Sequence, residues 1–432
     1  MLDGLPEAQD RRARWVLARL GVEVGGEPDD PPETVFAPRW RDMDYPASKF
    51  CAMRRAMGPW TIQGNERDPD GVLAITLSDP RSRAMRLRIG FEPEPDGRIS
   101  SLSLARPIPP GITIRVAGTK DFEQIVCLEQ ACPIDLGNGR SIETRRANFA
   151  AHLRLQGDTR LWVAERDGRI VALQWQTLRK LRLANREMHI GHTQLALVHP
   201  SERGAGLNQV FFRWHQEEVQ PLLDTFTAHQ DAGNAASRSS FGVGDHLNWR
   251  RQVQQVAIAC DPTAPSVGRA AMPADASQLA ALKNAAHAAD AMFAPAEAST
   301  FEERLNRAPE AYSWKDVLVG RGAFVGVWHS GETTVVRDAA GGAETKTLAA
   351  VLDYGFEGEA GLGELVALIH AAGARAARSG ATHLSLYTSE GSNAGAALGA
   401  LSANVDRFMF RTGIPEPPPT ERPGLYTDPI YV

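Results

Sequence analysis

The stretch of sequence that decides the fold is "HTQLALVHPSERGAGLNQ", residues 192–209. It opens with the apolar residues of a β-strand, which end at Val198, and then becomes polar and rich in glycine. An amphipathic segment follows at residues 210–223, "VFFRWHQEEVQPLL". This order predicts a strand over 187–198, a glycine-rich turn, and a helix over 206–220.

The predicted turn has the composition of an anion-binding site. Glycine allows positive φ and a close approach of the backbone to a ligand. The first N–H groups of a helix have no partner within the helix, and the helix dipole places partial positive charge there. A diphosphate is therefore the natural occupant of the turn, and Arg203 would add a charge-assisted contact to it.

The overall composition describes a globular protein with more than one core. Of its 432 residues, 43% are hydrophobic and 23% are charged. The net charge of −5 gives no support to binding of nucleic acid. The start of the chain lacks the apolar segment of a signal peptide, and no run of about 18 apolar residues marks a membrane span. We therefore expect a cytoplasmic protein with no membrane partner.

The cysteines predict neither a metal site nor a disulfide framework. Their spacing fits no zinc pattern, and four in a chain of this length are too few to staple the fold. We expect reduced thiols and no metal at Cys51, Cys127, Cys132 and Cys260.

Two parts of the chain begin alike, which indicates an internal duplication. The segment "RVAGTKDFEQIVCLEQA" from Arg115 aligns with "RAAMPADASQLAALKNA" from Arg269 at an offset of 154. Further matches pair "LALVH" at 195 with "LAAVL" at 348, and the surroundings of Asn234 with those of Asn393. Because the matches keep the same order, they predict a duplicated domain of about 150 residues, with chance similarity between alanine-rich helices as the alternative.

Proline- and glycine-rich linkers divide the chain into three predicted domains: 1–110, 111–262 and 266–432. In the first we expect helices over 7–20 and 47–57 and strands over 60–68, 71–79, 85–95 and 98–107, which together make a small α+β domain. Packing or dimerisation is its expected role, so a homodimer is compatible with the sequence. In the second domain, Asp167-Gly168 predicts a hairpin turn.

The stretch "LALVHPSERGAGL" resembles the acyl-CoA-binding motif of the GNAT superfamily of N-acyltransferases, V-x-P-x-x-R-G-x-G-x-G/A, at the end of the fourth strand. Five positions match the motif: Val198, Pro200, Arg203, Gly204 and Gly206. At the last position of the motif, where the family has a small residue, this sequence has Asn208. A later family motif, N-x-x-A/S-x-x-x-Y, matches at Asn234 and Ser237, with Phe241 in place of tyrosine. The resemblance implies a fold of the α+β or mixed α/β class. Two tandem GNAT-like domains, each with a central mixed sheet flanked by helices, would follow the small N-terminal α+β domain.

The resemblance also implies a cofactor, acetyl-CoA or another acyl-CoA. Its thioester and pantetheine would pair with main-chain N–H groups of the strand end, and its diphosphate would bind the turn. The implied cofactor-binding residues are Ala196, Leu197, Val198, Arg203, Gly204, Ala205, Gly206, Leu207, Asn208, Asn234, Ser237 and Phe241.

Acyl transfer to an amine requires a base, because an ammonium group has no lone pair. We predict His192, since strand alternation would place it on one face with Gln194, Ala196 and Val198. Alternatively, His192 is an ordinary strand histidine without a catalytic role. Glu187 and His189, on the same strand, are the other candidates for the base. In one tandem GNAT group the terminal carboxylate is the base, which would give that role to Val432. Phe241 cannot serve as the acid, although a thiolate leaves readily without one.

The predicted function is an acyl-CoA-dependent N-acyltransferase in which a primary amine, of a small molecule or a peptide, attacks the thioester directly. A non-catalytic acyl-CoA sensor or scaffold, or transfer to a hydroxyl, is the alternative. In the C-terminal copy an offset of 153 puts Thr345, Phe356 and Glu359 in place of His192, Arg203 and Gly206. This copy is therefore predicted to be degenerate.

Overall fold

The computed structural model describes residues 5–22, 24, 32–37, 59–78, 84–93, 95–137, 139–183, 186–219, 222–231, 249–389, 391–402, 405–412 and 424–428. The predicted helix over 47–57 lies outside these residues, as do Cys51 and Val432. Asn234, Ser237 and Phe241 of the second predicted motif also lie outside them.

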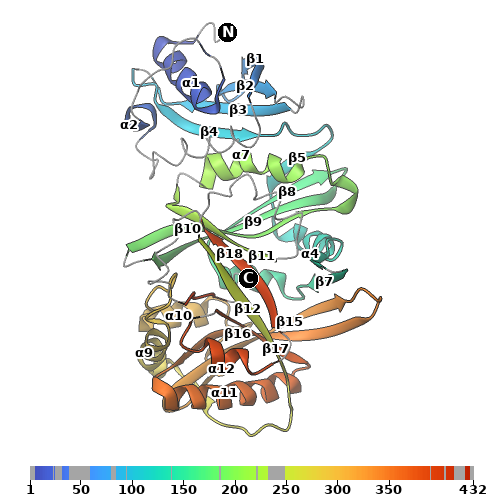
Figure 1. Cartoon of the computed structure of the whole chain (residues 1–432), viewed down its shortest axis with the longest axis vertical. Helices are drawn as coiled ribbons and strands as arrows, with labels where there is room; N and C mark the ends of the chain where they lie inside the picture. The colour runs from blue at the N-terminus through green and yellow to red at the C-terminus, as the bar shows by residue number, and fades with distance from the viewer. Residues whose placement is uncertain are drawn as a thin grey trace.

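The N-terminal part is a four-stranded antiparallel sheet covered by helix α1, Glu7–Leu20 (Figure 1). Helix α1 has the predicted bounds, and Gly21 at φ 79° ends it in a left-handed cap. Its apolar face, including Trp15 and Leu17, is buried against the sheet. The strands follow in sequence order close to their predicted positions, with a short helix α2 (Pro32–Val35) before them: β1 (Thr61–Arg67), β2 (Leu73–Ser78), β3 (Ala84–Phe91) and β4 (Ile99–Ala105).

The central part begins with strand β5 and a 3-10 turn, η1, that leads into helix α4. A hairpin, helix α5 and three long strands follow, of which the hairpin and α5 were not predicted. The elements are β5 (Thr113–Val116), η1 (Thr119–Asp121), α4 (Phe122–Gln130), β6 (Ile134–Gly137), β7 (Arg140–Arg145), α5 (Phe149–Gln156), β8 (Thr159–Arg166), β9 (Arg169–Leu183), β10 (Arg186–Val198), η2 (Pro200–Glu202), α6 (Leu207–Val210), α7 (Phe212–Trp214), η3 (His215–Val219), β11 (Thr225–Asp231) and β12 (Trp249–Ala259). The predicted β8–β9 turn is confirmed, with positive φ at Asp167 and Gly168.

The predicted helix over 206–220 is not one regular α-helix. It begins at Leu207, but it is divided into α6, α7 and the π-helical turn η3. π-helical turns inside helices are uncommon and are frequent at functional sites. Here Glu217 of η3 accepts hydrogen bonds from Arg88 of β3, at 3.0 Å, and from Ser103 of β4, at 2.6 Å. The segment is therefore held against the N-terminal sheet.

The C-terminal part repeats the order of the central part. Its elements are β13 (Arg269–Ala270), η6 (Pro273–Asp275), α9 (Ala276–His287), α10 (Ala298–Arg307), η7 (Trp314–Asp316), β14 (Val317–Val319), β15 (Ala323–Arg337), β16 (Ala343–Phe356), α11 (Gly358–Arg378), β17 (His383–Ser389), α12 (Gly395–Gly399) and β18 (Val405–Thr412). In the part of the chain that the structure describes, no helix has the length and apolar character of a membrane-spanning segment.

Repeated side-chain contacts confirm the duplication. Arg115 binds both carboxylate oxygens of Asp121, at 2.6 and 2.9 Å. At the offset of 154, Arg269 binds Asp275 in the same way, at 2.7 Å to each oxygen. Each aspartate also accepts the backbone N–H of the residue three positions before it, at 2.7 and 2.9 Å. Each copy therefore opens with the same ion pair, which joins its first strand to its first helix.

The two copies exchange their last strands. Strand β12 follows β11 in the chain, but it pairs with β17 and β18. Strand β18 ends the C-terminal copy, but it pairs with β11 of the central copy. In Figure 1, β12 and β18 run side by side between the two copies. Fourteen strands of the described residues thereby form one continuous sheet, so the copies share a sheet even though their sequences are consecutive.

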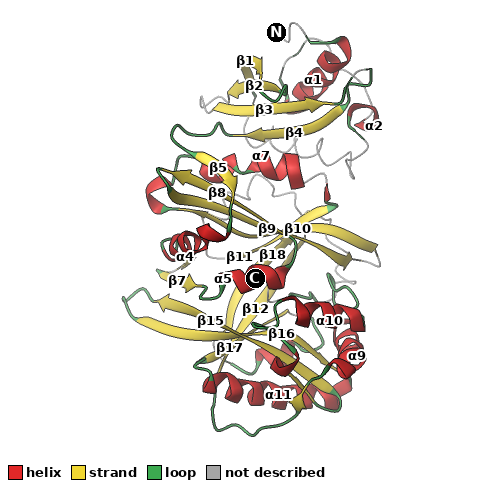
Figure 2. Cartoon of the chain, turned by 180° about the vertical axis from the view of Figure 1, so that it is seen from behind, coloured by secondary structure: helices red, strands yellow, loops and turns green. Residues whose placement is uncertain are grey.

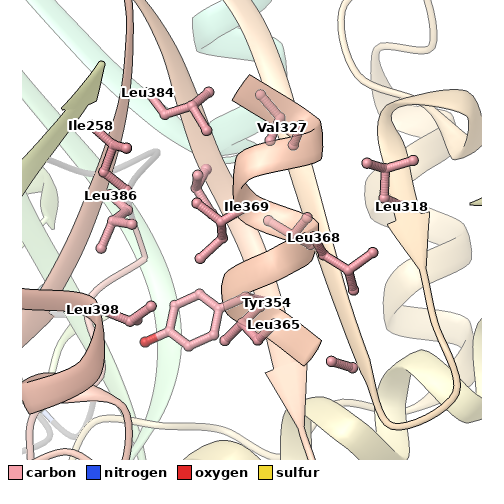
Figure 3. Close-up of a cluster of buried hydrophobic side chains, with 14 of the residues drawn as sticks. Ile258, Leu318, Val327, Tyr354, Leu365, Leu368, Ile369, Leu384, Leu386 and Leu398 are labelled. Atoms are coloured by element: carbon pink, nitrogen blue, oxygen red, sulfur yellow. The ribbon is translucent and has the colours of Figure 1, made fainter. Parts of the chain in front are cut away.

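The exchange carries core residues from one copy into the other. Ile258 of β12 is buried among Leu384 and Leu386 of β17 and Ile369 of α11 (Figure 3). Burial of one such side chain stabilises the fold by about 1.5–3 kcal/mol. Helix α5 of the central copy lies toward the C-terminal copy (Figure 2), and its His152 ring is 5.3 Å from that of Trp328.

Candidate functional site

A β-bulge in β10 changes which of the predicted site residues share a face. Thr193 pairs with Gln176 of β9, and Leu195 pairs with Trp175, so Gln194 is an extra residue in β10. Beyond the bulge the alternation is reversed. The expectation that His192 shares a face with Ala196 and Val198 is therefore wrong.

The face of β10 that carries His192 is the one covered by α5. Gln194 lies on this face as well, where its amide contacts Gln156 of α5. Ala196 and Val198 lie on the opposite face, which α6 and α7 cover, and Val198 packs there beside Leu207 and Phe211.

Strands β10 and β11 separate at their carboxyl-terminal halves. They pair in parallel only over Ile190–Thr193 and Thr225–Ala228. The His199 N–H donates to Val171 of β9, so strand alternation directs the N–H groups of Val198 and Ala196 away from β9, toward the separated side. The predicted donors therefore face an opening between two strands.

The turn after β10 needs its glycines. Gly204 has φ 89° and Gly206 has φ 78°, values that other residues rarely adopt. At Gly206 a side chain would also collide with a neighbour, because an added Cβ would lie 2.5 Å from Cδ of Arg106. Arg106 follows β4 of the N-terminal part, so that part reaches the turn.

Four arginines surround this turn: Arg106, Arg166, Arg169 and Arg203. Arg166 binds Glu202, with Nε–Oε1 and Nη2–Oε2 distances of 3.1 and 3.2 Å, and so neutralises it. Arg169 lies 3.0 Å from Nε2 of His199. Within the described residues, Arg106 has no carboxylate in ion-pair reach. The turn therefore has an excess of positive charge around backbone that can approach a ligand.

The cysteine nearest to the turn is Cys132. Its Sγ and the Nε of Arg203 each donate to the Val198 carbonyl, both at 3.4 Å. Burial raises the pKa of the Cys132 thiol, and the adjacent Arg203 offsets part of this effect. Cys127, Cys132 and Cys260 are free thiols, as expected.

A cavity of about 320 Å³ lies beside the turn, between α4 and the start of β9. His199 and Arg169 line it, together with Glu123 and Cys127 of α4. Its size lies in the range of small-molecule sites.

His192 is fully buried, at 0% exposure, and forms a chain of polar contacts with β11. Its Nδ1 is 2.8 Å from the Thr227 hydroxyl, and its Nε2 is 3.3 Å from Nδ1 of His229. His229 is half-buried and directly follows Ala228, the last residue of β11 that pairs with β10. His229 therefore lies where the two strands begin to separate.

The structure does not bring Glu187 and His189 together with His192. No bulge interrupts Arg186–Thr193, so Glu187 and His189 face the side opposite to His192. Glu187 is exposed and forms an ion pair with Lys180, at 2.9 Å. It lies roughly 16 Å along the strand from His192.

Sequence reasoning missed His229 and Arg106. Both could have been considered from residue type, since one is a histidine on the next strand and the other an arginine before a linker. Their positions depend on strand pairing and on how the N-terminal part packs, and neither is encoded in a local pattern.

In the C-terminal copy the equivalent turn is missing. Strands β16 and β17 pair in parallel only over Leu348–Ala350 and then separate, as β10 and β11 do. One residue, Glu357, connects β16 to α11, whereas residues 199–206 connect β10 to α6. The pairs Ile190–Thr225 and Leu348–His383 set an offset of 158 for both strands. The assignments at an offset of 153 are therefore wrong, and Ala350 takes the place of His192. This copy lacks both the histidine and the glycine-rich turn.

The segment Gly424–Asp428 is docked in this second copy. The N–H of Leu425 donates to Ser389 at the end of β17, at 2.7 Å, and the N–H of Tyr426 donates to Ala291, at 2.9 Å. Asp428 accepts two hydrogen bonds from Arg304, at 2.7 and 3.0 Å.

Arg304 belongs to a buried charge cluster. Asp353 accepts from Lys283 at 2.5 Å, from Arg304 at 2.9 Å and from the Tyr312 hydroxyl at 3.0 Å. Burial alone would raise the pKa of Asp353, but Arg304 and Lys283 outweigh it and lower the pKa to about 2. The charges of Lys283 and Arg304 therefore balance those of Asp353 and Asp428 inside the C-terminal copy.

Comparison with solved structures shows the same architecture. Saccharomyces cerevisiae N-myristoyltransferase with bound myristoyl-CoA and inhibitors aligns with a TM-score of 0.52 and 11% identity, over 72% of this chain and 83% of that one. A second structure of that enzyme, with bound myristoyl-CoA, aligns with a TM-score of 0.50 and 10% identity, over 71% and 84%. The chain has the tandem GNAT fold.

Another structure, a tandem GNAT protein from the clavulanic acid biosynthesis pathway, aligns with a TM-score of 0.43 and 15% identity, over 71% of this chain and 100% of that one. No protein-family model and no curated protein matches the sequence. At this identity the tandem GNAT fold does not assign residues, so the roles of individual side chains are argued from geometry.

Proposed function

We propose that the protein is an acyl-CoA-dependent N-acyltransferase with its working site in the central copy. The observation that carries this proposal is the separation of β10 from β11 directly before the arginine-surrounded turn. The opening offers main-chain donors to an acyl thioester, and the turn offers backbone and cations to a diphosphate. N-myristoyltransferase, which shares the fold, binds an acyl-CoA in its solved structures.

The cofactor would lie along the strand end. The N–H groups of Ala196 and Val198 would donate to the thioester oxygen and the pantetheine, which stabilises negative charge on that oxygen during attack. The diphosphate would bind at Arg203–Gly206, with Arg106 and Arg203 as counter-charges. Acetyl-CoA is the proposed cofactor.

The proposed acceptor is a primary amine of a small molecule or peptide. Its lone pair forms the new C–N bond, the C–S bond breaks, and CoA leaves as a thiolate. The amine proton passes to His229, directly or through water. We assign the contact with substrate to His229 because it directly follows the last residue of β11 that pairs with β10, whereas His192 is fully buried within the paired region. His192 and Thr227 would orient the His229 ring and stabilise its charged form.

The test is release of free CoA thiol from acetyl-CoA with a panel of amines, alongside calorimetry of CoA binding. Wild-type protein should bind CoA and turn over with at least one amine, and Arg203→Glu should weaken CoA binding by about tenfold or more. Binding without turnover by any amine would support a sensor instead. Absence of CoA binding would refute the proposed function.

A further inference from the structure

A second cavity, of about 440 Å³, lies where the C-terminal copy meets the central copy. The end of α11, the turn η7 and strand β15 form most of its wall, and Asn148 before α5 contributes from the central copy. None of the residues that line it belongs to the turn at 199–206 or to the opening between β10 and β11. It is thus separate from the proposed acyl-CoA site.

Three cations line this cavity: Lys315, Arg375 and Arg378. Lys315 and Arg378 are exposed, and within the described residues none of the three has a carboxylate in ion-pair reach. Arg375 is fixed in place because its Nη2 donates to the Lys315 carbonyl, at 2.8 Å.

The two acidic residues of the wall are already occupied. Glu310 forms an ion pair with Arg154 of α5. Asp316 accepts hydrogen bonds from both the N–H and the hydroxyl of Ser313, each at 2.9 Å. Because Arg154 offsets Glu310, the three cations outnumber the one remaining carboxylate, Asp316, and the cavity keeps an excess of positive charge.

The arginines are not needed to cap α11. Cations near the end of a helix often compensate its unpaired carbonyl groups and its dipole. Here the carbonyls of Ala376 and Ala377 already accept from Ser379, Gly380 and Ala381. Since these carbonyls are already paired, the arginines are less needed to compensate the end of the helix than they would be where the last carbonyls have no partner.

His329 of β15 supplies a titratable group in the same wall. Its Nδ1 is buried and has no hydrogen-bond partner among the described residues. Burial lowers the pKa of His329, and the charges of Arg375 and Lys315 lower it further, against the opposing effect of Asp316. An anion bound beside the ring would raise that pKa, which makes His329 a reporter of occupancy.

We propose that this cavity binds a small molecule carrying a phosphate or diphosphate group, held by Lys315, Arg375 and Arg378. Arginine and lysine are the residues that most often bind phosphate, and the volume falls within the usual range of small-molecule sites. Because Asn148 and α11 belong to different copies, the bound molecule would bridge them.

The experiment titrates the full-length protein with inorganic pyrophosphate and follows binding by calorimetry. The test variant is Lys315→Gln/Arg378→Gln, which removes the two exposed charges and leaves the Arg375 contact in place. Its affinity should fall by about tenfold or more. The matched control, Lys120→Gln, removes an exposed charge in the central copy and should change the affinity by less than about twofold.

Two further measurements separate this site from the turn. Arg203→Gln should leave pyrophosphate binding at the cavity intact, whether or not the proposed acyl-CoA site exists. The pKa of His329, assigned by NMR through loss of its signal in His329→Gln, should rise when pyrophosphate saturates the protein. Absence of binding at millimolar pyrophosphate, an unchanged affinity in the double variant, or loss of binding only with Arg203→Gln would each overturn the proposal.

Discussion

Nδ1 of His229 lies 3.3 Å from Nε2 of His192, and His229 directly follows the last residue of β11 that pairs with β10. The enclosed ring of His192 is fixed on its other side by Thr227, at 2.8 Å. A buried, hydrogen-bonded histidine behind a half-buried one is an arrangement that can accept a proton at the opening and share the resulting charge. This pair is where the proposed chemistry is most directly tested.

Replacing His229 by alanine should lower kcat of acyl transfer by about 10²–10⁴-fold, the range that general bases contribute. Affinity for CoA should change little, because the diphosphate contacts lie at the turn. His192→Gln should lower kcat less, since it acts through His229. Steady-state kinetics with the best amine, together with CoA calorimetry, measure both effects.

The matched control for that experiment is His383→Gln, a histidine of the C-terminal copy that contacts Thr382. It should retain wild-type kcat. If His229→Ala kept full activity while His192→Gln lost it, the assignment of His229 as the substrate-contacting base would be wrong.

Alanine at Gly206 should impair the turn more than alanine at Gly204. Both positions have positive φ, but only at Gly206 would the new Cβ also meet a neighbour, Cδ of Arg106 at 2.5 Å. We expect CoA affinity to fall further in Gly206→Ala than in Gly204→Ala. Shortening the obstructing side chain, in Gly206→Ala/Arg106→Ala, should recover part of the lost thermal stability. Equal effects of the two glycine variants would show that contact with Arg106 is unimportant.

Removal of the Asp428 carboxylate should strongly destabilise the C-terminal copy. Asp428→Ala leaves Arg304 buried with one partner fewer, and breaking a buried ion pair costs about 3–5 kcal/mol. Glu310→Ala, which removes the exposed partner of Arg154, should change stability little, because water screens exposed ion pairs. Urea unfolding followed by fluorescence measures both variants, and similar losses in the two would contradict a role of burial.

Asp353 should make stability depend on pH under acidic conditions. Its folded pKa is about 2, below the value of about 3.9 in an unfolded chain, so the unfolded state binds the proton first as pH falls. The stabilisation is complete above about pH 5 and is lost as pH falls toward 2. Urea unfolding at pH 6, 4 and 3 should show a steeper decline for wild type than for Asp353→Asn, and parallel declines would contradict this.

The exchange of β12 and β18 predicts that neither copy folds alone. Residues 1–262 lack β18, which pairs with the free edge of β11, and residues 266–432 lack β12, which pairs with the free edge of β17. Each fragment should be insoluble or aggregated when expressed alone, while co-expression should give one soluble complex on gel filtration. Two soluble, monomeric, folded fragments would contradict the exchange.

Much of the fold could be predicted from the sequence because local patterns determine it. Alternation and turn residues gave the strands of the N-terminal sheet, the β8–β9 hairpin and the long strand that ends at Val198. The repeated Arg115–Asp121 and Arg269–Asp275 spacing indicated the duplication, and its contacts confirm it. These features depend on neighbours within a few residues or on a fixed offset.

The candidate site was less predictable because it depends on pairing. One extra residue at Gln194 reverses the faces of β10, which no periodicity within the strand reveals. The offset between the two copies changes from 154 at Arg115 and Arg269 (269 − 115) to 158 at Ile190 and Leu348 (348 − 190), which a constant offset cannot represent. The roles of Glu187, His189 and the residues of the second motif stay predictions.

The sequence by itself determined the strand, the glycine-rich turn and the existence of two copies, because φ preferences, hydrophobic periodicity and repetition are properties of the chain. Only the tertiary structure decided which strands pair across the copies and which histidine lies at the opening. It also placed Arg106 beside Gly206, in contact with the turn. Those outcomes depend on contacts between segments that lie far apart in the chain, such as 37 residues for His192 and His229 and 100 for Arg106 and Gly206, whose free energy no short stretch of sequence contains.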